Sequence, residues 1–253
     1  MKIGIIGTGA IGGTLARKMV TAGHDVKVAN SGDGDKLQAR AAELGAQPSA
    51  LKDVVANVEV IILSLPTVAI PTLPKNLFCG LPDKVIIVDT SNYYPFRDAL
   101  IEDLQKGKPE SVWVSEQLGR PVVKAFNNLL AETLLSGGKK PASAHRIEMA
   151  IAGDDANAKK IVADLADDAG FDAVDSGSLE NSWRHQPGTP AYCTELNKEE
   201  LSISLKKADK KKAQSIRDKA IEELGSRTTY PSHQQIVAFN RNLFLENPKK
   251  LSR

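Results

Sequence analysis

A glycine-rich segment close to the first residue limits the possible folds more than any other feature of the sequence. It follows the apolar stretch 3–6 and precedes an amphipathic stretch, 10–22, whose apolar residues share one helical face. A GxGxxG between a strand and a helix is typical of the first βα turn of a dinucleotide-binding fold. The helix N-terminus then faces the phosphates of the ligand. The segment predicts dinucleotide binding by Gly7, Thr8, Gly9, Ala10, Ile11 and Gly12.

The same segment partly matches the phosphate-binding loop of nucleoside triphosphatases. Gly7, Gly12 and Thr14 fit G-x-x-x-x-G-K-[ST], but Gly13 stands where that loop has its lysine. Without this cation nothing holds the β- and γ-phosphates. The sequence therefore favours a dinucleotide over a triphosphate.

Short apolar runs alternate with helical patterns through the first two thirds of the chain. The predicted strands cover 3–6, 25–29, 58–63, 84–89, 121–125, 147–152 and 172–174, and the predicted helices cover 10–22, 35–44, 49–56 and 156–169. Unbroken Val and Ile runs indicate strands that are covered on both faces. The pattern predicts an α/β fold: a Rossmann-type, doubly wound, mainly parallel sheet with a C-terminal helical extension.

The pattern changes near residue 178. Residues 183–192 are rich in proline and glycine and predict a loop, 196–224 predict mostly helix, and Ser232 is placed to cap a last helix that ends near Leu245. We therefore expect a Rossmann domain over residues 1–177. Residues 178–253 are expected to form a loop and helical extension that packs on it.

Composition restricts the partners. The net charge of +2 argues against nucleic acid and membrane partners, and the lysines of 206–219 are interleaved with acidic residues. The longest apolar run, 58–70, contains Pro66 and is too short to span a bilayer. Cys79 and Cys193 form no CxxC pair, and no signal-peptide pattern opens the chain. These features predict a cytoplasmic protein with a small-molecule partner.

The end of the second predicted strand distinguishes NAD from NADP. NAD-binding folds carry an acidic residue there for the ribose 2′-hydroxyl, whereas this chain has Asn30 and Ser31. Lys36 and Arg40 follow on the next predicted helix and could contact a 2′-phosphate, although Asp33 and Asp35 lie in the same segment. The balance favours NADP over NAD.

Several motifs together resemble the coenzyme F420-dependent NADP oxidoreductase family. They are IGIIGTGAIGGTLA, VANS, SLP, VDTSNYYPFRD, VVKAFNN and AGDD, spread over roughly residues 1–190. The related cytosolic domains of six-transmembrane metalloreductases share this fold and pass hydride to a flavin. The resemblance implies NADP(H) as cofactor, with F420 or a flavin as a co-substrate.

The resemblance also implies roles for particular residues. Ser31 matches a family serine that contacts the 2′-phosphate, while Gly32 replaces the family arginine and gives more weight to Lys36. The segment Ser64, Leu65 and Pro66 would line the nicotinamide ribose, and residues 123–127, with Ala125, Phe126 and Asn127, would lie near the nicotinamide. Asn92 and Asn127 could hydrogen-bond the ribose or the carboxamide, or hold their own turns.

No recognisable general acid or metal site accompanies these motifs. The patterns YxxxK, GxxxKxxxN and HExxH are absent, as is any Cys/His ligand spacing. Carbonyl reduction needs a proton donor at the developing alkoxide, whereas hydride transfer to a flavin-like ring needs mainly alignment. Lys124, His185 and Tyr192 remain the catalytic candidates, with Lys124 read as a solvent-exposed residue at a strand end.

The sequence thus predicts an NADP(H)-dependent oxidoreductase that transfers hydride to or from a flavin- or deazaflavin-like acceptor. Two alternatives stay open: an NADP-dependent dehydrogenase or imine reductase acting on a small substrate, and a non-catalytic NADP-binding sensor. The extension could reshape the acceptor site or form a homodimer contact.

Overall fold

The computed structural model describes residues 1–32, 34–229 and 231–245 and contains a six-stranded, wholly parallel sheet. Its strand order is β3-β2-β1-β4-β5-β6, the order of a doubly wound dinucleotide-binding fold. The strands are β1 (Lys2–Ile6), β2 (Asp25–Ala29), β3 (Gln47–Pro48), β4 (Val60–Leu63), β5 (Ile86–Asp89) and β6 (Val123–Lys124). The predicted Rossmann fold is confirmed.

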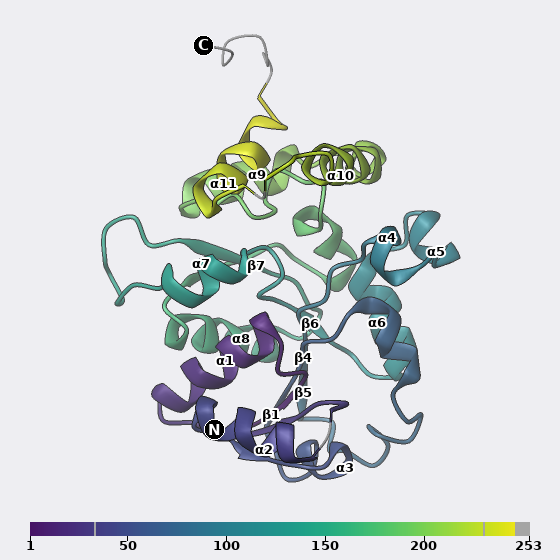
Figure 1. The fold of residues 1–253 in the computed structure, drawn as a ribbon, viewed down its shortest axis with the longest axis vertical. Coiled ribbons are helices and arrows are strands. Elements are labelled where there is room, and N and C mark those ends of the chain that lie inside the picture. Colours follow the sequence, from purple (N-terminus) through teal and green to yellow (C-terminus); the bar gives the residue numbers. More distant parts are fainter. Residues whose placement is uncertain (33, 230, 246–253) are drawn as a thin grey trace.

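Helices cover both faces of the sheet (Figure 1). On one face a buried cluster joins Ile3 and Ile62 to α1 (Ala10–Thr21), α2 (Gly34–Leu44), α7 (Ala131–Ser136) and α8 (Ala156–Asp168). On the other, Ile6 and Ile61 pack with α3 (Leu51–Val54), the 3-10 helix η1 (Thr67–Thr72), α5 (Glu102–Gln105) and α6 (Glu110–Leu118). Successive strand residues thus serve opposite cores, which explains the unbroken apolar runs.

The last two predicted strands leave the main sheet. β7 (Glu148–Ile151) and β8 (Asp172–Asp175) pair in parallel as a separate two-stranded sheet. One antiparallel bridge, between Lys124 and Ala152, connects it to the end of β6. Apolar periodicity identified both strands correctly but contains no information on which neighbour each one pairs with.

Helical predictions were least accurate in the middle of the chain. The helix expected over 49–56 shortens to α3, because Ala50 is extended and Asn57 takes a left-handed φ of 55°. The structure adds η1, α4 (Pro95–Asp98), α5, α6 and α7, none of which has a long apolar period. The predicted loop 183–192 begins inside a second 3-10 helix, η2 (Leu179–His185).

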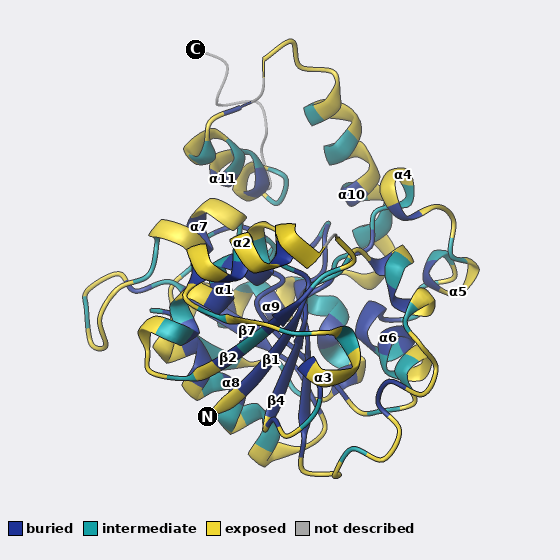
Figure 2. Cartoon of the chain, turned by 60° about the horizontal axis from the view of Figure 1, so that its bottom comes forward, coloured by how far each residue is buried: buried dark blue, intermediate teal, exposed yellow. Residues whose placement is uncertain are grey.

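In the described part of the chain, three helices follow η2: α9 (Lys198–Lys207), α10 (Lys210–Gly225) and α11 (His233–Asn242). The helical stretch expected over 196–224 is interrupted between α9 and α10, where Asp209 caps α10, and Ser232 caps α11 as expected. Figure 2 shows that the central strands of the main sheet are largely buried whereas much of α10 is exposed. No helix within the described residues is long and apolar enough to cross a membrane.

Side-chain hydrogen bonds attach α10 to the sheet domain and α11 to the segment that follows η2. Gln214 on α10 donates from Nε2 to the carbonyl of Leu104 at 2.7 Å. Asn240 and Arg241 on α11 donate to the carbonyls of Cys193 and Thr194 at 3.2 and 2.6 Å. The expected division of the chain at residues 177 and 178 remains a prediction.

Candidate functional site

The three motif glycines differ in their surroundings as a dinucleotide loop requires. Gly7 has a φ of +102°, and a Cβ there would lie 2.1 Å from the Ser64 carbonyl oxygen. At Gly12 a Cβ would meet the Gly7 carbonyl oxygen at 2.0 Å. A Cβ at Gly9 would meet no atom within 4 Å, so the backbone is open to an approaching group. Gly9 precedes α1, whose first turn has no side-chain cap and therefore keeps free N–H groups.

The carboxyl ends of four strands come together beside this loop. The Ser64 amide donates to Ile6 at 2.9 Å, the Thr90 amide to Leu63 at 3.1 Å, and the Ala125 amide to Asp89 at 3.1 Å. These bonds continue the parallel ladder past β1, β4, β5 and β6. Ligands of open α/β sheets bind at this edge, where the strand order reverses. The expected residues 64–66, 92 and 125–127 therefore follow neighbouring strands at one edge.

The end of β2 carries no carboxylate at the two positions expected to choose the cofactor. The Asn30 amide donates to Thr8 Oγ1 at 3.0 Å and accepts from the Gly32 backbone at 2.9 Å, so it links the two loops. Ser31 and Lys36 are exposed. Arg40 instead pairs with Glu43 at 2.8 Å and lies against Gly13. Asp33, weighed above against a phosphate, lies outside the described residues.

Asn92, Asn127 and His185 form one hydrogen-bonded cluster. Asn127 Nδ2 donates to Asn92 Oδ1 at 3.0 Å and to the His185 carbonyl at 2.8 Å. Asn127 Oδ1 accepts from His185 Nδ1 at 2.9 Å, which places the imidazole proton on Nδ1. His185 Nε2 is buried without a partner among the described residues. Burial and then the nearby Lys124 charge lower the pKa of His185 to about 3, so the ring is neutral.

The backbone after β6 is strained. Phe126 is fully buried and has a φ of 59°, a left-handed conformation that bulky side chains rarely adopt. Its amide donates to Met149 Sδ at 3.0 Å, and its side chain packs in the core. Such strain persists where the surrounding structure enforces it, often at ligand sites. Ala125 is also buried, so residues 125 and 126 present backbone rather than side chains to the sheet edge.

The exposed position expected for Lys124 was wrong. Its side chain is fully buried, and Nζ lies 3.2 Å from Asp89 Oδ2 and donates to the Ser91 carbonyl. Glu110 Oε2 lies 3.9 Å away. The residue follows Val123 on a strand whose alternate positions face opposite cores, and the α6 side holds carboxylates that compensate the charge.

Tyr192 also takes part in a buried network. Its hydroxyl hydrogen-bonds the Tyr94 hydroxyl, and burial first, then neighbouring groups, raise the pKa of Tyr192 well above its usual value. Burial likewise raises the pKa of the adjacent Cys193 to about 12. Within the described residues no group of three or more His, Cys, Asp or Glu side chains could hold a metal ion.

Sequence reasoning missed the carboxylates around Lys124. Asp89 is fully buried and also accepts from Ser111 Oγ at 2.6 Å, and Glu110 is 5% exposed. Burial raises the pKa of Glu110 to about 7, although Lys124 opposes the shift. Asp89 ends an apolar strand, a position that could have been noticed. Glu110 gives no such signal, since its burial depends on how α6 docks.

Known proteins show a consistent likeness to this chain. The family described as NADP oxidoreductase, coenzyme F420-dependent, matches residues 2–93. The protein YjhV of Escherichia coli K12 is 33% identical over 98 residues, which are 39% of this chain and 72% of YjhV. The crystal structure of the hypothetical protein SMa0349 of Sinorhizobium meliloti has 31% sequence identity and a TM-score of 0.67, covering 78% of this chain and 96% of SMa0349.

A longer relative shares only this portion. The metalloreductase STEAP3 of Rattus norvegicus is 31% identical over 188 residues. The match covers 72% of this chain but 35% of STEAP3, so the chain corresponds to about a third of that protein.

Proposed function

The chain belongs to the family of coenzyme F420-dependent NADP oxidoreductases, and on that premise we propose that it transfers hydride between the nicotinamide of NADP(H) and a flavin- or deazaflavin-like ring. Membership makes the chain an NADP-dependent oxidoreductase. The nature of the acceptor and the residues that hold the two rings are the proposed part.

The nucleotide half of the proposal is supported by the glycine loop. Open space at Gly9 and the uncapped start of α1 suit a pyrophosphate. The exposed Ser31 hydroxyl and Lys36 ammonium are proposed to contact the 2′-phosphate, because no carboxylate stands at 30 or 31 to repel it. The segment 64–66 and the backbone of 125–127 are proposed to flank the nicotinamide end.

One observation supports the acceptor class most strongly: all three candidate acids are engaged or in the wrong protonation state. Lys124 Nζ is held by Asp89 and the Ser91 carbonyl. His185 is neutral near pH 7 and carries its proton on the nitrogen bound to Asn127. The Tyr192 hydroxyl is hydrogen-bonded to the Tyr94 hydroxyl. Transfer between two stacked rings requires alignment rather than an acid beside an alkoxide, and this arrangement suits it.

Steady-state oxidation of NADPH in the presence of F420, FMN or a simple cyclic imine tests the proposal. We expect turnover with F420 or FMN and none with the imine. With F420 and NADPH deuterated in turn at each face of C4, one isomer is expected to deliver deuterium to carbon 5 of the deazaflavin, where it does not exchange with water. This result would demonstrate hydride transfer rather than electron transfer.

The alternatives give different results in the same assay. Turnover with the imine alone would mean that the acceptor is a small substrate rather than a flavin-like ring. Tight NADPH binding without turnover on any acceptor would indicate a sensor. A Gly9→Val variant is the control, because blocking the open side of the loop is expected to abolish turnover without changing the fold.

A further inference from the structure

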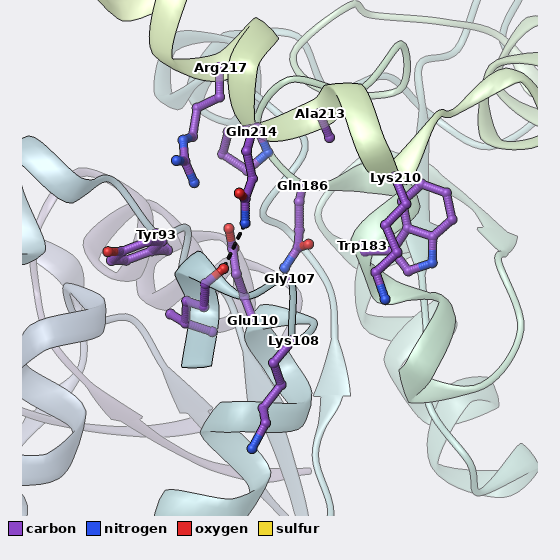
Figure 3. A pocket seen from close by; sticks show the side chains of 12 residues that line it. Tyr93, Gly107, Lys108, Glu110, Trp183, Gln186, Lys210, Ala213, Gln214 and Arg217 are labelled. Carbon is purple, nitrogen blue, oxygen red and sulfur yellow. Dashed lines mark hydrogen bonds between the residues drawn. The ribbon is translucent and has the colours of Figure 1, made fainter. Parts of the chain in front are cut away.

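A small cavity lies between α10 of the extension and the α5–α6 region of the sheet domain (Figure 3). Its lining includes no residue of the glycine loop. Its wall includes Tyr93, Glu110, Gln186, Gln214 and Arg217. The volume of about 40 Å³ is room for roughly three water-sized groups, given about 10–15 Å³ for one. That is the size of a carboxylate group rather than of a nucleotide.

Arg217 reaches this cavity as a buried cation with one unpaired nitrogen. The residue is 4% exposed, and its Nε donates to Asp218 Oδ1 at 2.8 Å. The guanidinium lies 5.4 Å from the Tyr93 ring centre, within the range of a cation–π contact. Its Nη2 is buried without a hydrogen-bond partner among the described residues. An unpaired buried guanidinium nitrogen is costly unless a ligand or water completes it.

A second unpaired donor lines the same wall. Gln186 is 9% exposed, and its Nε2 also lacks a partner in the described part of the chain. Figure 3 shows that Gln186, Arg217 and Glu110 enter the space from three different segments, whereas Lys108 points away. Lys108 is instead engaged with Asp103 and Glu116 at 3.1 and 2.7 Å. Glu110 Oε2 on the same wall is also buried without a hydrogen-bond partner in the described part of the chain, and it can donate only when the carboxyl is protonated. With Glu110 protonated, every unpartnered group on this wall is a donor, which indicates a ligand that provides oxygens.

The fold holds this arrangement in place. Gly188, with a φ of +85°, lets the chain touch α10, because a Cβ there would lie 2.0 Å from the Ala213 carbonyl and 2.8 Å from the Arg217 amide. Gln214 fixes α10 to Leu104 one turn before Arg217. The position of the guanidinium therefore follows from the docking of α10.

We propose that this cavity binds a small monocarboxylate, whose oxygens accept hydrogen bonds from Arg217 Nη2 and Gln186 Nε2. The charge of Glu110 on the wall disfavours a phosphate dianion more than a carboxylate. When Glu110 is protonated, its carboxyl group adds a third donor to the site. The groups that face the Glu110 carboxyl are Lys124 on β6, Asp89 on β5, Arg217 on α10 and the Tyr93 backbone. Because the pKa of Glu110 is raised to about 7, binding strengthens as the pH falls through 7.

Titration calorimetry with sodium acetate, at constant ionic strength and without NADP(H), tests the site. We expect saturable binding to the wild type, stronger at pH 6 than at pH 8, and none with acetamide. Arg217→Gln is expected to weaken binding at least tenfold, and Gln186→Leu several-fold. Lys219→Gln, which removes an exposed charge from the same helix, should leave it unchanged. Glu110→Gln should bind acetate with no pH dependence between 6 and 8.

Two outcomes would overturn the proposal. Acetate binding that is absent from the wild type, or equal in Arg217→Gln and Lys219→Gln, would mean that the cavity holds water only. If Arg217→Gln does not fold, Gln186→Leu takes its place in the comparison, and equal acetate binding by Gln186→Leu and Lys219→Gln would overturn the proposal. Inorganic phosphate that binds more tightly than acetate would also contradict the charge argument. If the natural ligand is a separate carboxylate, added acetate should leave the KM of the hydride acceptor unchanged. If the cavity instead binds a carboxylate group of the acceptor, acetate should be a competitive inhibitor against the acceptor.

Discussion

The Nδ1 atom of His185 lies 2.9 Å from the Oδ1 atom of Asn127, although the two residues are 58 positions apart in the chain. The bond joins η2 to the turn after β6, and Asn127 extends it to Asn92 after β5. The cluster thus holds two neighbouring strand ends and the start of the extension together. Its members are positioning residues for the sheet edge where the nicotinamide is proposed to lie.

Acid should destabilise the protein through His185. The unfolded imidazole gains a proton below its ordinary pKa of about 6.5, whereas the folded one does so only near 3. The free energy of unfolding therefore falls as the pH falls below 6.5, by about 2 kcal/mol between pH 7 and 5 from this group. Urea unfolding at both pH values measures the loss. His185→Asn should remove this part of the pH dependence, and His145→Asn at an exposed histidine should not.

Alanine at two motif glycines should separate binding from folding. Gly9→Ala projects a methyl group into open space and should lower the affinity for NADPH at least tenfold. The same substitution should change the free energy of unfolding by less than about 0.5 kcal/mol. Gly12→Ala drives a Cβ against the Gly7 carbonyl and should cost about 1–3 kcal/mol of stability. Fluorescence titration and thermal unfolding measure the two effects. Equal behaviour of both variants would contradict the assigned roles.

Removing Lys36 should reduce discrimination between cofactors. A charge-assisted bond to the 2′-phosphate contributes about 1.5–3 kcal/mol, so Lys36→Ala should weaken NADPH binding about ten- to a hundredfold and leave NADH unaffected. Lys52→Ala, an exposed lysine on α3, is the matched control. An equal loss of affinity for NADPH and NADH would mean that Lys36 does not contact the 2′-phosphate.

An arginine at position 32 should have the opposite effect. Gly32 is exposed, and a Cβ there would lie 3.2 Å from Asn30 Oδ1, so a side chain needs only a small adjustment. Gly32→Arg should tighten NADPH binding severalfold while NADH binding stays constant. A loss of affinity for both cofactors would indicate that the loop was displaced.

Lys124 should matter first for stability. Lys124→Met leaves the Asp89 and Glu110 carboxylates without their buried cation, a change that typically costs about 3–5 kcal/mol. Lys160→Met breaks only an exposed pair with Asp164 and should cost less than about 1 kcal/mol. Urea unfolding at pH 7.5 compares the two variants. Similar losses in the free energy of unfolding would mean that the buried ion pair contributes little to stability.

Local chemistry explains what the sequence predicted well. The strand over 25–29 was predicted with its observed bounds, because apolar residues flanked by polar turns leave few alternatives. The short helices α3 to α7 were poorly predicted, since fewer than three turns leave little periodicity to detect. Lys124 shows the same limit for a site residue: a lysine in a strand looks exposed until its carboxylate neighbours are known.

The sequence alone determined the glycine loop, the alternation of strands and helices, and the absence of an acidic residue at 30 and 31, because each depends on residues close together in the chain. The tertiary structure decided which distant side chains meet. It brought His185 into hydrogen-bond contact with Asn127, buried Lys124 beside Asp89 and Glu110, and brought Arg217 to a cavity between α10 and the α5–α6 region. These contacts depend on the docking of η2, α6 and α10, and docking results from packing over the whole surface rather than from any local pattern.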